Sequence, residues 1–273
     1  MSAAGIRFEF GRNWRRFASG ISEAQVNAAV RGLQDMLGPG LAGLSFLDVG
    51  CGSGLSSLAA VRLGARVHAF DYDEESVNVA MTLRDQFGIA ADEWSIEHGD
   101  VLDEAFVAGL GQWDVVYAWG VLHHTGDMWR ALNCVDGLVS DGGRLFVALY
   151  NDQGWVSRVW RLVKRTYVAS PRWLRFLLVV IAAVPLWGLP LVRDLLRGNS
   201  GTWWKAYYEK RGMSPLWDLV DWVGGYPFEV ADPDDVISRY EDKAWSVEHV
   251  IKVGNRLGCN QFVFCKSRPL SPR

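Results

Sequence analysis

The sequence predicts an α/β fold: a doubly wound, mostly parallel sheet of seven strands that ends in an antiparallel hairpin and carries a helical insertion after the fifth strand. Three observations support this prediction. Short apolar segments alternate with amphipathic ones from residue 44 to residue 150, as expected where helices cover both faces of a parallel sheet. The alternation stops over residues 151–226 and then resumes. With 273 residues, the chain can bury the core of such a fold without disulfides.

The elements before residue 150 are indicated by caps, glycine turns and apolar spacing. A first helix is expected after Ser22, because Ser22 and Gln25 can form a capping box and the apolar spacing ends in a Gly-Pro-Gly segment. Five strands then alternate with helices. We expect these strands over residues 44–50, 66–72, 94–100, 113–120 and 144–150, the last one preceded by a Ser-Asp-Gly-Gly turn.

The rest of the chain divides into an insertion and the end of the core. Residues 151–226 contain eight of the 14 tryptophans. A helix is expected after Asp232, because Pro233 suits the first helical position. Two segments, 245–254 and 259–266, are separated by a short turn and predict an antiparallel hairpin at the sheet edge. We therefore expect a core over residues 1–150, an insertion over 151–226, and a closing helix and hairpin over 227–268.

The glycine-rich turn "FLDVGCGSG" after the first expected strand is the sharpest indication of a ligand site. Gly50, Gly52 and Gly54 allow the backbone to approach a ligand closely, and the following helix offers unpaired N–H groups. A dinucleotide-binding fingerprint would need a third glycine where Leu55 stands, and Asp48 at the strand end would disfavour a pyrophosphate. The turn therefore favours a ligand other than a dinucleotide.

Three further segments end or follow the later strands: "HAFDYD", "EHGD" and "DVVYAWGVLHHTGD". With the glycine-rich turn, they resemble in order and spacing the motifs of class I S-adenosylmethionine-dependent methyltransferases. The resemblance covers residues 44–150 and implies that S-adenosylmethionine is the cofactor. It implies that Asp71 holds the ribose hydroxyls, a task that suits a carboxylate, and that Asp100 lies near the adenine amino group. Asp73 is expected to cap the next helix. The cofactor-binding residues expected on this basis are Asp48, Gly50, Cys51, Gly52, Gly54, Asp71, Tyr72, Asp100, Val101 and Trp119.

Methyl transfer from a sulfonium mainly requires alignment of the reacting atoms and exclusion of water. An oxygen acceptor also benefits from a general base within hydrogen-bond reach. His123 and His124 follow the fourth strand, at the edge where open sheets bind ligands, and are the candidate catalytic residues. We favour His124, and a role in a loop or helix cap is the alternative for both. The expected acceptor pocket contains Tyr150, Asn151, Asp221, Tyr226 and Glu229.

The N-terminal segment "FEFGRNWRRF" offers a further contact with the cofactor. Arg12 or Trp14 of this segment can fold over the cofactor, although a surface helix is the favoured interpretation.

The insertion differs in charge from the rest of the chain. Residues 155–200 contain eight basic side chains and one acidic side chain, so this stretch carries +7 whereas the whole chain carries −3. The segment "WVSRVWRLVKRTYV" predicts a basic amphipathic helix. Its basic face is expected to hold Arg158, Arg161 and Arg165, and its apolar face Val156, Trp160, Val163 and Tyr167. Tryptophans and arginines beside apolar residues suit an anionic membrane surface.

The uncharged run over residues 176–192 has 17 residues and contains Pro185 and Pro190, whereas a membrane-spanning helix needs about 20 residues. Three interpretations stay open. The run lies in a membrane interface, or it forms a lid packed on the catalytic part or on a partner, or, least favoured, it spans a membrane.

Composition excludes several other classes of protein. The net charge of −3 argues against a general nucleic-acid binder. The four cysteines, Cys51, Cys134, Cys259 and Cys265, show no metal-binding or paired spacing, so no metal site is expected. The N-terminus lacks the pattern of a secretory signal, which favours a cytoplasmic protein. Contact with a membrane is a separate expectation, which rests on the insertion.

The expected function is methyl transfer to a small, apolar or lipid-like acceptor, most simply to an oxygen. The resemblance extends furthest toward the bacterial quinone-ring O-methylases, although the insertion here is longer and of different composition. An RNA methyltransferase that uses the basic stretch and a cofactor-binding regulatory protein without turnover are the alternatives. The acceptor and the oligomeric state are not predicted.

Overall fold

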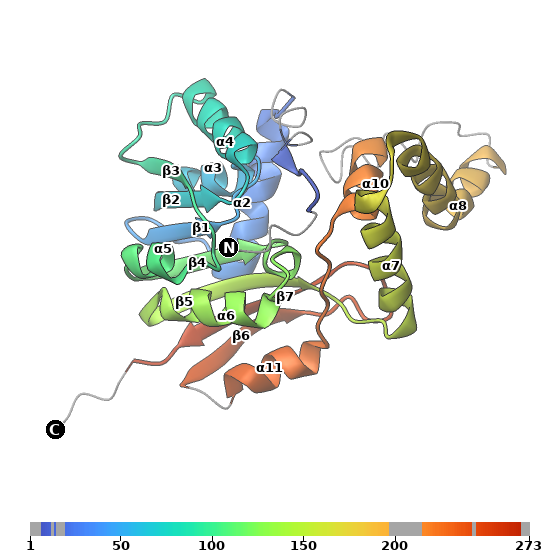
Figure 1. Ribbon diagram of the computed structural model, residues 1–273. Helices are drawn as coiled ribbons and strands as arrows, with labels where there is room; N and C mark the ends of the chain where they lie inside the picture. The colour runs from blue at the N-terminus through green and yellow to red at the C-terminus, as the bar shows by residue number, and fades with distance from the viewer. Residues whose placement is uncertain (1–6, 12–13, 15–19, 197–214, 242–243, 269–273) are drawn as a thin grey trace.

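The computed structural model describes residues 7–11, 14, 20–196, 215–241 and 244–268. Within them, seven strands form one sheet with the order β3-β2-β1-β4-β5-β7-β6 (Figure 1). The first five strands are parallel, whereas β7 pairs antiparallel with β5 and with β6. The strands are β1 (Ser45–Val49), β2 (Arg66–Asp71), β3 (Trp94–His98), β4 (Trp113–Trp119), β5 (Val139–Tyr150), β6 (Trp245–Ile251) and β7 (Cys259–Lys266).

The predicted fold class is confirmed, including the C-terminal hairpin at the sheet edge. Ser22 forms the predicted capping box at the start of α2, and Asp73 caps α4. One predicted turn was wrong. The Ser-Asp-Gly-Gly segment belongs to β5, where the pairing with β4 shifts register between Trp113 and Val115. The two glycines therefore lie in an irregular part of a strand that continues through them.

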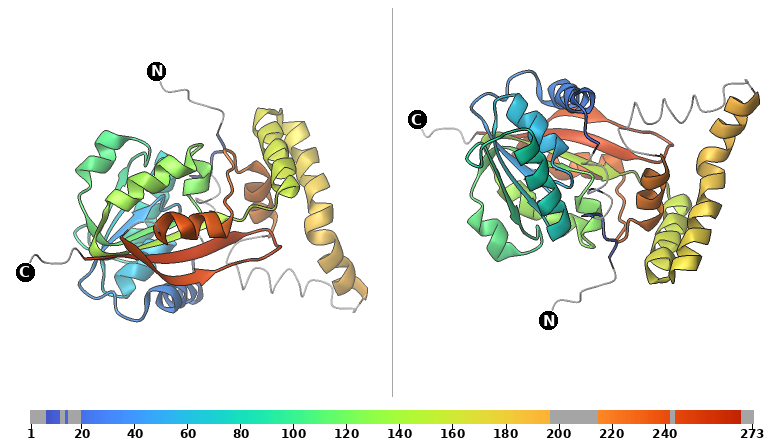
Figure 2. Two further views of the ribbon diagram at one scale, coloured as in Figure 1. Left: turned by 90° about the horizontal axis from the view of Figure 1, so that it is seen from below. Right: turned by 90° about the horizontal axis from the view of Figure 1, so that it is seen from above.

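Helices cover both faces of the sheet and make a three-layered core (Figures 1 and 2). Alternate residues of a strand point to opposite faces, so Phe46 and Leu47 belong to two separate apolar clusters. The first cluster includes residues of α2 (Glu23–Leu37), α3 (Leu55–Arg62) and α4 (Glu74–Gln86). The second includes residues of α5 (Glu104–Gly109), α6 (Met128–Gly137) and α11 (Pro233–Glu241).

The strand order places the ligand-binding edge at the carboxyl end of β1. This strand lies between β2 and β4, so the chain leaves β1 toward one side of the sheet and later returns on the other. Such a reversal opens a crevice at the strand ends, where open α/β sheets bind ligands. The glycine-rich turn follows β1, and the short helix η1 (Leu122–His124) follows β4.

The insertion forms helices that stand at one end of the molecule (Figure 2). They are α7 (Trp155–Ala169), α8 (Arg172–Leu196) and α10 (Pro215–Gly224). Their inner faces share an apolar cluster of their own, which also contains Phe8 and Tyr226. No helix of the described residues meets the length and hydropathy needed to cross a bilayer.

Helix α8 is continuous through Pro185 and Pro190. The predicted apolar face of α7 contributes Trp160, Val163 and Tyr167 to the insertion's own core, so these three side chains pack inside the protein.

The basic face of α7 is only partly as predicted. Arg158, Arg161 and Arg165 are exposed, as expected. Lys164, which was counted with the basic stretch, is completely buried. The exposed apolar side chains of α7 are Trp155, Val159 and Leu162, spaced along a different face.

Candidate functional site

A cavity of about 590 Å³ lies at the carboxyl edge of the parallel strands. This volume is within the range of small-molecule sites. Of the residues expected to form a site, those in the cavity wall are Gly50, Gly52, Asp71, Tyr72, Asp100, Val101, Trp119, His124 and Tyr226. The structure thus brings together residues from the ends of four strands.

The glycine-rich turn forms the floor of the cavity. Gly50 and Gly52 have φ angles of 70° and 54°. Residues other than glycine rarely adopt these backbone angles. A Cβ atom on Gly50 would lie 2.2 Å from the Val121 side chain, and one on Gly52 would lie 3.1 Å from the Trp14 ring. Close approach of neighbouring groups therefore requires glycine at both positions.

Asp71 at the end of β2 is positioned by two backbone groups. Its Oδ1 accepts a hydrogen bond from the Asp73 N–H and its Oδ2 accepts one from the Gly52 N–H, both at 2.9 Å. Burial raises the pKa of this carboxyl to about 6, against the lowering effect of the two hydrogen bonds. An ionised carboxylate has about four acceptor sites. Asp71 therefore keeps capacity to accept hydrogen bonds from a ligand in the cavity.

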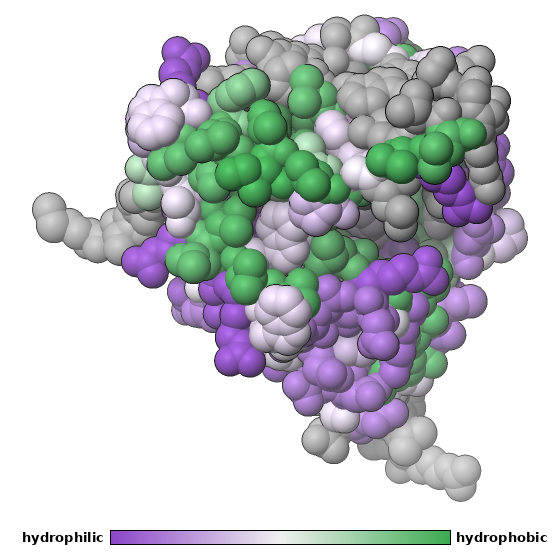
Figure 3. Space-filling model, turned by 90° about the vertical axis from the view of Figure 1, so that its right-hand side faces the viewer, coloured by the Kyte–Doolittle hydropathy of each residue, from purple (hydrophilic) through white to green (hydrophobic). Residues whose placement is uncertain are grey.

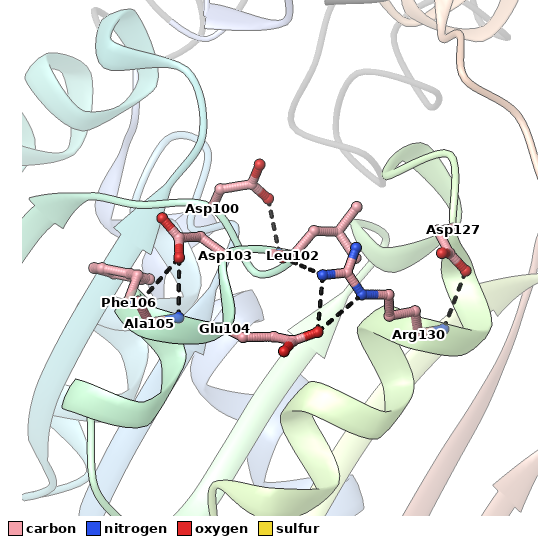
Figure 4. Close-up of polar contacts among 8 residues, drawn as sticks. All are labelled: Asp100, Leu102, Asp103, Glu104, Ala105, Phe106, Asp127 and Arg130. Atoms are coloured by element: carbon pink, nitrogen blue, oxygen red, sulfur yellow. Dashed lines mark hydrogen bonds and ion pairs between the residues drawn. The ribbon is translucent and has the colours of Figure 1, made fainter. Parts of the chain in front are cut away.

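Asp100 is held by a loop that is tied to two helices (Figure 4). Its carboxylate accepts the Leu102 N–H at 2.9 Å. The Arg130 guanidinium donates to the Leu102 carbonyl and to Glu104, each at 2.9 Å. Asp103 caps α5 through the Ala105 and Phe106 N–H groups, and Asp127 caps α6 through the Arg130 N–H. These bonds fix the loop and hold Asp100 at the cavity wall.

Three of the residues expected to bind the cofactor lie beneath the wall instead of in it. Asp48 is 2% exposed and accepts a hydrogen bond from the Ser57 hydroxyl at 2.6 Å. Burial raises the pKa of Asp48 to about 7. Cys51 is buried in the apolar cluster of α2, α3 and α4, and Gly54 lies against the Trp94 ring. These residues support the turn from behind.

Residues 7–11 are here called the N-terminal strap, and Arg7, Phe8, Glu9 and Phe10 of this strap line the cavity. The Arg7 guanidinium donates to the Thr125 carbonyl at 2.6 Å and lies 4.7 Å from the centre of the Tyr72 ring. The Phe8 N–H donates to the Tyr226 carbonyl at 2.9 Å, and the Gly11 N–H donates to Asp73 at 2.8 Å. The strap thus links the loops that follow β2 and β4 with the end of the insertion.

The favoured expectation of a surface helix for this segment holds only in part: residues 7–10 are not helical, whereas Gly11 and Trp14 are, and the Trp14 N–H donates to the Phe10 carbonyl at 3.2 Å. Trp14 lines the cavity. Arg12 lies outside the described residues.

His124 is the imidazole that faces the cavity. Its Nδ1 lies 2.7 Å from the Pro227 carbonyl, and a carbonyl can only accept, so Nδ1 carries the proton. The lone pair of the neutral ring is then on Nε2. The Phe10 ring packs 4.9 Å from the imidazole. Burial, followed by the charge of Lys164, lowers the pKa of His124 to about 3. The ring is therefore neutral near pH 7, and its Nε2 carries a free lone pair, although the lowered pKa makes it a weaker base than a free imidazole.

His123 lies behind this imidazole and outside the cavity wall. Its side chain is completely buried, and burial lowers its pKa. Its ring packs 3.8 Å from the Tyr150 ring, which is itself 5.5 Å from His124. His123 and Tyr150 therefore support His124 from the protein side.

The other residues expected in an acceptor pocket have structural contacts. The Asn151 amide donates to the Gly254 carbonyl at 2.7 Å and borders a second, open groove. Glu229 accepts the Met128 N–H at 3.0 Å at the start of α6. Asp221 lies on α10, where its charge acts on Lys164. Among the five residues predicted for this pocket, Tyr226 is the one in the cavity wall.

Sequence reasoning missed two features of the site, the contacts of the strap and the position of Lys164. The strap had a usable signal, since Phe8 and Phe10 are apolar residues in a segment without helical periodicity. Lys164 had a partial signal, because helical spacing places it beside Trp160 and Tyr167 on the apolar face, but the rings around its ammonium come from distant segments.

Comparison with known proteins agrees with this geometry. Residues 47–145 match a family model described as a methyltransferase domain. The chain is 36% identical over 111 residues to a ubiquinone biosynthesis O-methyltransferase from Methylocella silvestris, and 35% identical over 112 residues to one from Pseudomonas paraeruginosa. These matches cover 41% of this chain, and 41% and 47% of the relatives. The chain thus spans less than half the length of these curated relatives.

Solved structures show the same fold at low identity. The magnesium protoporphyrin IX methyltransferase from Synechocystis PCC 6803, solved with bound SAH, has a TM-score of 0.54 and 16% identity, and the match covers 94% of each chain. An O-methyltransferase family protein from Burkholderia thailandensis has a TM-score of 0.52 and 14% identity, with 89% of this chain and 58% of that chain covered.

Proposed function

The chain belongs to the class I S-adenosylmethionine-dependent methyltransferases, and we propose that it methylates an oxygen of a small, apolar acceptor. The observation that carries this proposal is His124. Its Nδ1–H is held by a backbone carbonyl while the ring borders the cavity. A base held in one tautomer beside the reacting centre is what oxygen methylation benefits from.

We propose that the cofactor lies over the glycine-rich turn. When bound, it supplies a methyl group that is already activated on a positively charged sulfur. Asp71 would accept hydrogen bonds from the two ribose hydroxyls, and Asp100 would accept one from the adenine amino group. Tyr72 and Val101 border the same part of the cavity and offer apolar surface for the base. The donors and acceptors of this wall therefore match those of the cofactor.

His124 would complete the reaction at the other end of the cavity. As the acceptor oxygen takes the methyl group, its proton passes to Nε2 of His124. The Pro227 carbonyl stabilises the imidazolium that results, because it accepts the Nδ1–H bond. The strap and Trp14 exclude water from the reacting atoms.

The acceptor is expected to be apolar because of the side chains near His124. Phe8, Phe10, Trp119 and Tyr226 line the cavity, and the Phe10 ring packs on the His124 imidazole. Phe8 and Tyr226 also pack on the apolar cluster of the insertion. A continuous apolar surface thus runs from the cavity into the insertion, which suits an acceptor with an aromatic ring or an alkyl chain.

Product analysis with matched variants tests the reaction. Cell extract is incubated with the protein and methyl-labelled S-adenosylmethionine, and labelled products are identified by mass spectrometry. His124→Ala should lower turnover by about 10²- to 10⁴-fold, with little change in cofactor affinity. His249→Ala, at an exposed position on β6, is the control. Full turnover of the His124 variant would remove this residue from the mechanism, and cofactor binding without any labelled product would favour a regulatory protein.

We further propose that the insertion binds an anionic membrane surface. The face of the molecule formed by α7 and α8 carries a broad apolar area beside hydrophilic residues (Figure 3). The exposed apolar side chains of α8 include Trp173, Phe176, Leu177, Val180, Ile181 and Val184. Exposed basic residues in these helices are Arg158, Arg161, Arg165, Arg172 and Arg193. Apolar side chains bordered by basic ones suit the interface of a bilayer with anionic lipid, and suit RNA less because RNA binding favours stacking platforms.

Vesicle flotation tests this surface. The double variant Phe176→Asn with Ile181→Asn should lose retention on phosphatidylglycerol vesicles, whereas Val247→Asn, an exposed apolar position on β6, should keep it. Equal retention of both variants on the vesicles would contradict the proposal that this surface binds membranes. Binding to RNA instead of vesicles would favour the RNA methyltransferase.

A further inference from the structure

The amino group of Lys164 lies in a place where a charge is costly. Its side chain is completely buried on α7, and its ammonium donates a hydrogen bond to the carbonyl of Trp222 on α10. The ammonium nitrogen lies 4.5 Å from the centre of the Trp222 ring, 4.8 Å from that of Phe228 and 5.8 Å from that of Tyr150. Burial of a cation is unfavourable unless its partners compensate, and the reaction described above makes no use of this residue.

The aromatic residues around Lys164 are also those that support the two imidazoles. The Tyr150 ring packs on His123 and His124. Phe228 follows Pro227, whose carbonyl accepts the Nδ1–H bond of His124. Lys164 and the two imidazoles therefore share Tyr150 as a packing partner, and the segment of Pro227 and Phe228 contacts both Lys164 and His124.

The charge of Lys164 acts on the same imidazoles. After burial, it is the next cause that lowers the pKa of His124, and it contributes to the lowered pKa of His123. Charges interact strongly where water is excluded. Several titratable or charged groups lie on the elements around Lys164. They are Asp221 on α10, Glu229 in the loop between α10 and α11, Tyr150 on β5, His123 and His124 on η1, Arg161 on α7 and Arg7 on the strap.

We propose that Lys164 is a positioning residue that couples the insertion to the reaction. Through its aromatic surroundings it fixes the orientation of His124, and through its charge it sets how readily Nε2 of His124 takes a proton. With Lys164 charged, His124 is a weaker base, and with Lys164 neutral, His124 is a stronger one. This inference rests on the proposed function, in which His124 accepts the proton of the acceptor.

Nuclear magnetic resonance of the full chain with ¹⁵N-labelled histidine tests the coupling, with the His124 signals assigned from His124→Gln. Burial lowers the pKa of Lys164 to about 7. The ring nitrogens of His124 should therefore change shift with a midpoint near pH 7 while the ring stays neutral. In Lys164→Met this midpoint should vanish, and the protonation midpoint of His124 should move up from about 3 toward 6.5.

A second variant separates charge from packing. Lys164→Gln keeps a donor for the Trp222 carbonyl but has no charge, so it should also lose the midpoint near pH 7 and should keep the proton on Nδ1 of His124. Lys252→Met, a matched change at an exposed ion pair with Asp234, should leave the His124 signals unchanged. The proposal is overturned if the midpoint persists in both Lys164 variants or is absent from the unmodified protein. The spectra need no acceptor, so a failed methylation assay would remove the proposed function without removing this coupling.

Discussion

Replacing Lys164 with methionine should make the protein more stable at neutral pH, although it alters the proposed site. Methionine is similar in length and carries no charge to desolvate. The expected gain follows from the lowered pKa of Lys164, which falls from 10.5 to about 7. At 1.36 kcal/mol for each pKa unit, keeping this lysine charged in the folded state costs about 5 kcal/mol.

Two losses offset part of this gain. The Trp222 carbonyl loses its donor, which costs about 1–3 kcal/mol when the group is buried. The contacts of the ammonium with the rings of Trp222 and Phe228 are also lost, at about 1–2 kcal/mol. The net stabilisation of Lys164→Met at pH 6.5 is therefore expected to be about 0–3 kcal/mol.

The sign of the pH dependence is the sharper prediction. Between pH 7 and pH 10.5 the unfolded chain holds the Lys164 proton and the folded chain has lost it, so the stability of the unmodified protein rises with pH. Lys164→Met lacks this group. Its advantage should therefore shrink by about 1.4 kcal/mol for each pH unit in this window and should reverse in sign within it, by about pH 9.

Urea unfolding followed by tryptophan fluorescence measures these differences at pH 6.5, 8 and 9.5. The difference between the two proteins cancels the titration of groups that they share, and Lys252→Met serves as the control. A difference in unfolding free energy that stays constant across the three pH values would refute the burial of a charged Lys164. A Lys164→Met variant that is less stable at pH 6.5 would refute it as well.

Two other substitutions test the cavity floor and the turn behind it. Asp71→Asn should weaken binding of S-adenosylhomocysteine at least about tenfold in calorimetry, since an amide accepts fewer hydrogen bonds than a carboxylate, and an unchanged affinity would contradict the ribose assignment. Gly54→Ala should cost about 1–3 kcal/mol in urea unfolding, because φ is 79° and the Cβ atom would lie 2.8 Å from the Trp94 ring. Gly32→Ala, where a Cβ atom meets nothing within 4 Å, should instead be neutral or stabilising, and equal losses in the two glycine variants would contradict the steric argument.

The features that were predictable from the sequence depend on neighbouring residues. The glycine-rich turn and the cap at Ser22 are set by residues within a few positions of one another, so their chemistry is visible in the sequence. The β-strands were equally visible, because each is a short apolar segment bounded by turns. The carboxyl edge followed from the order of strands and helices, which placed Asp71 and Asp100 in one site.

The features that were missed depend on contacts between distant segments. Asp48 has the residue type and spacing of a ligand-binding carboxylate, but its contact with Ser57 and its burial follow from how α3 packs. The hydrogen bond from Arg7 to the Thr125 carbonyl joins residues 118 positions apart. A helical projection shows that Lys164 lies beside Tyr167 and Val168, but it does not show the aromatic rings that surround the ammonium.

The two faces of α7 connect the membrane proposal with the chemistry of the site. Its outer side exposes Trp155, Val159 and Leu162, whereas its inner side buries Lys164 against the residues that support His124. A rigid helix transmits a displacement of one face to the other. If α7 settles on a bilayer as proposed, a displacement of α7 relative to β5 and η1 would change the distance from the Lys164 ammonium to the His124 ring, and with it the proton affinity of His124. An insertion with an apolar core at this position would be more stable but would lack this connection, which gives a physical reason for a buried lysine where methionine would fit.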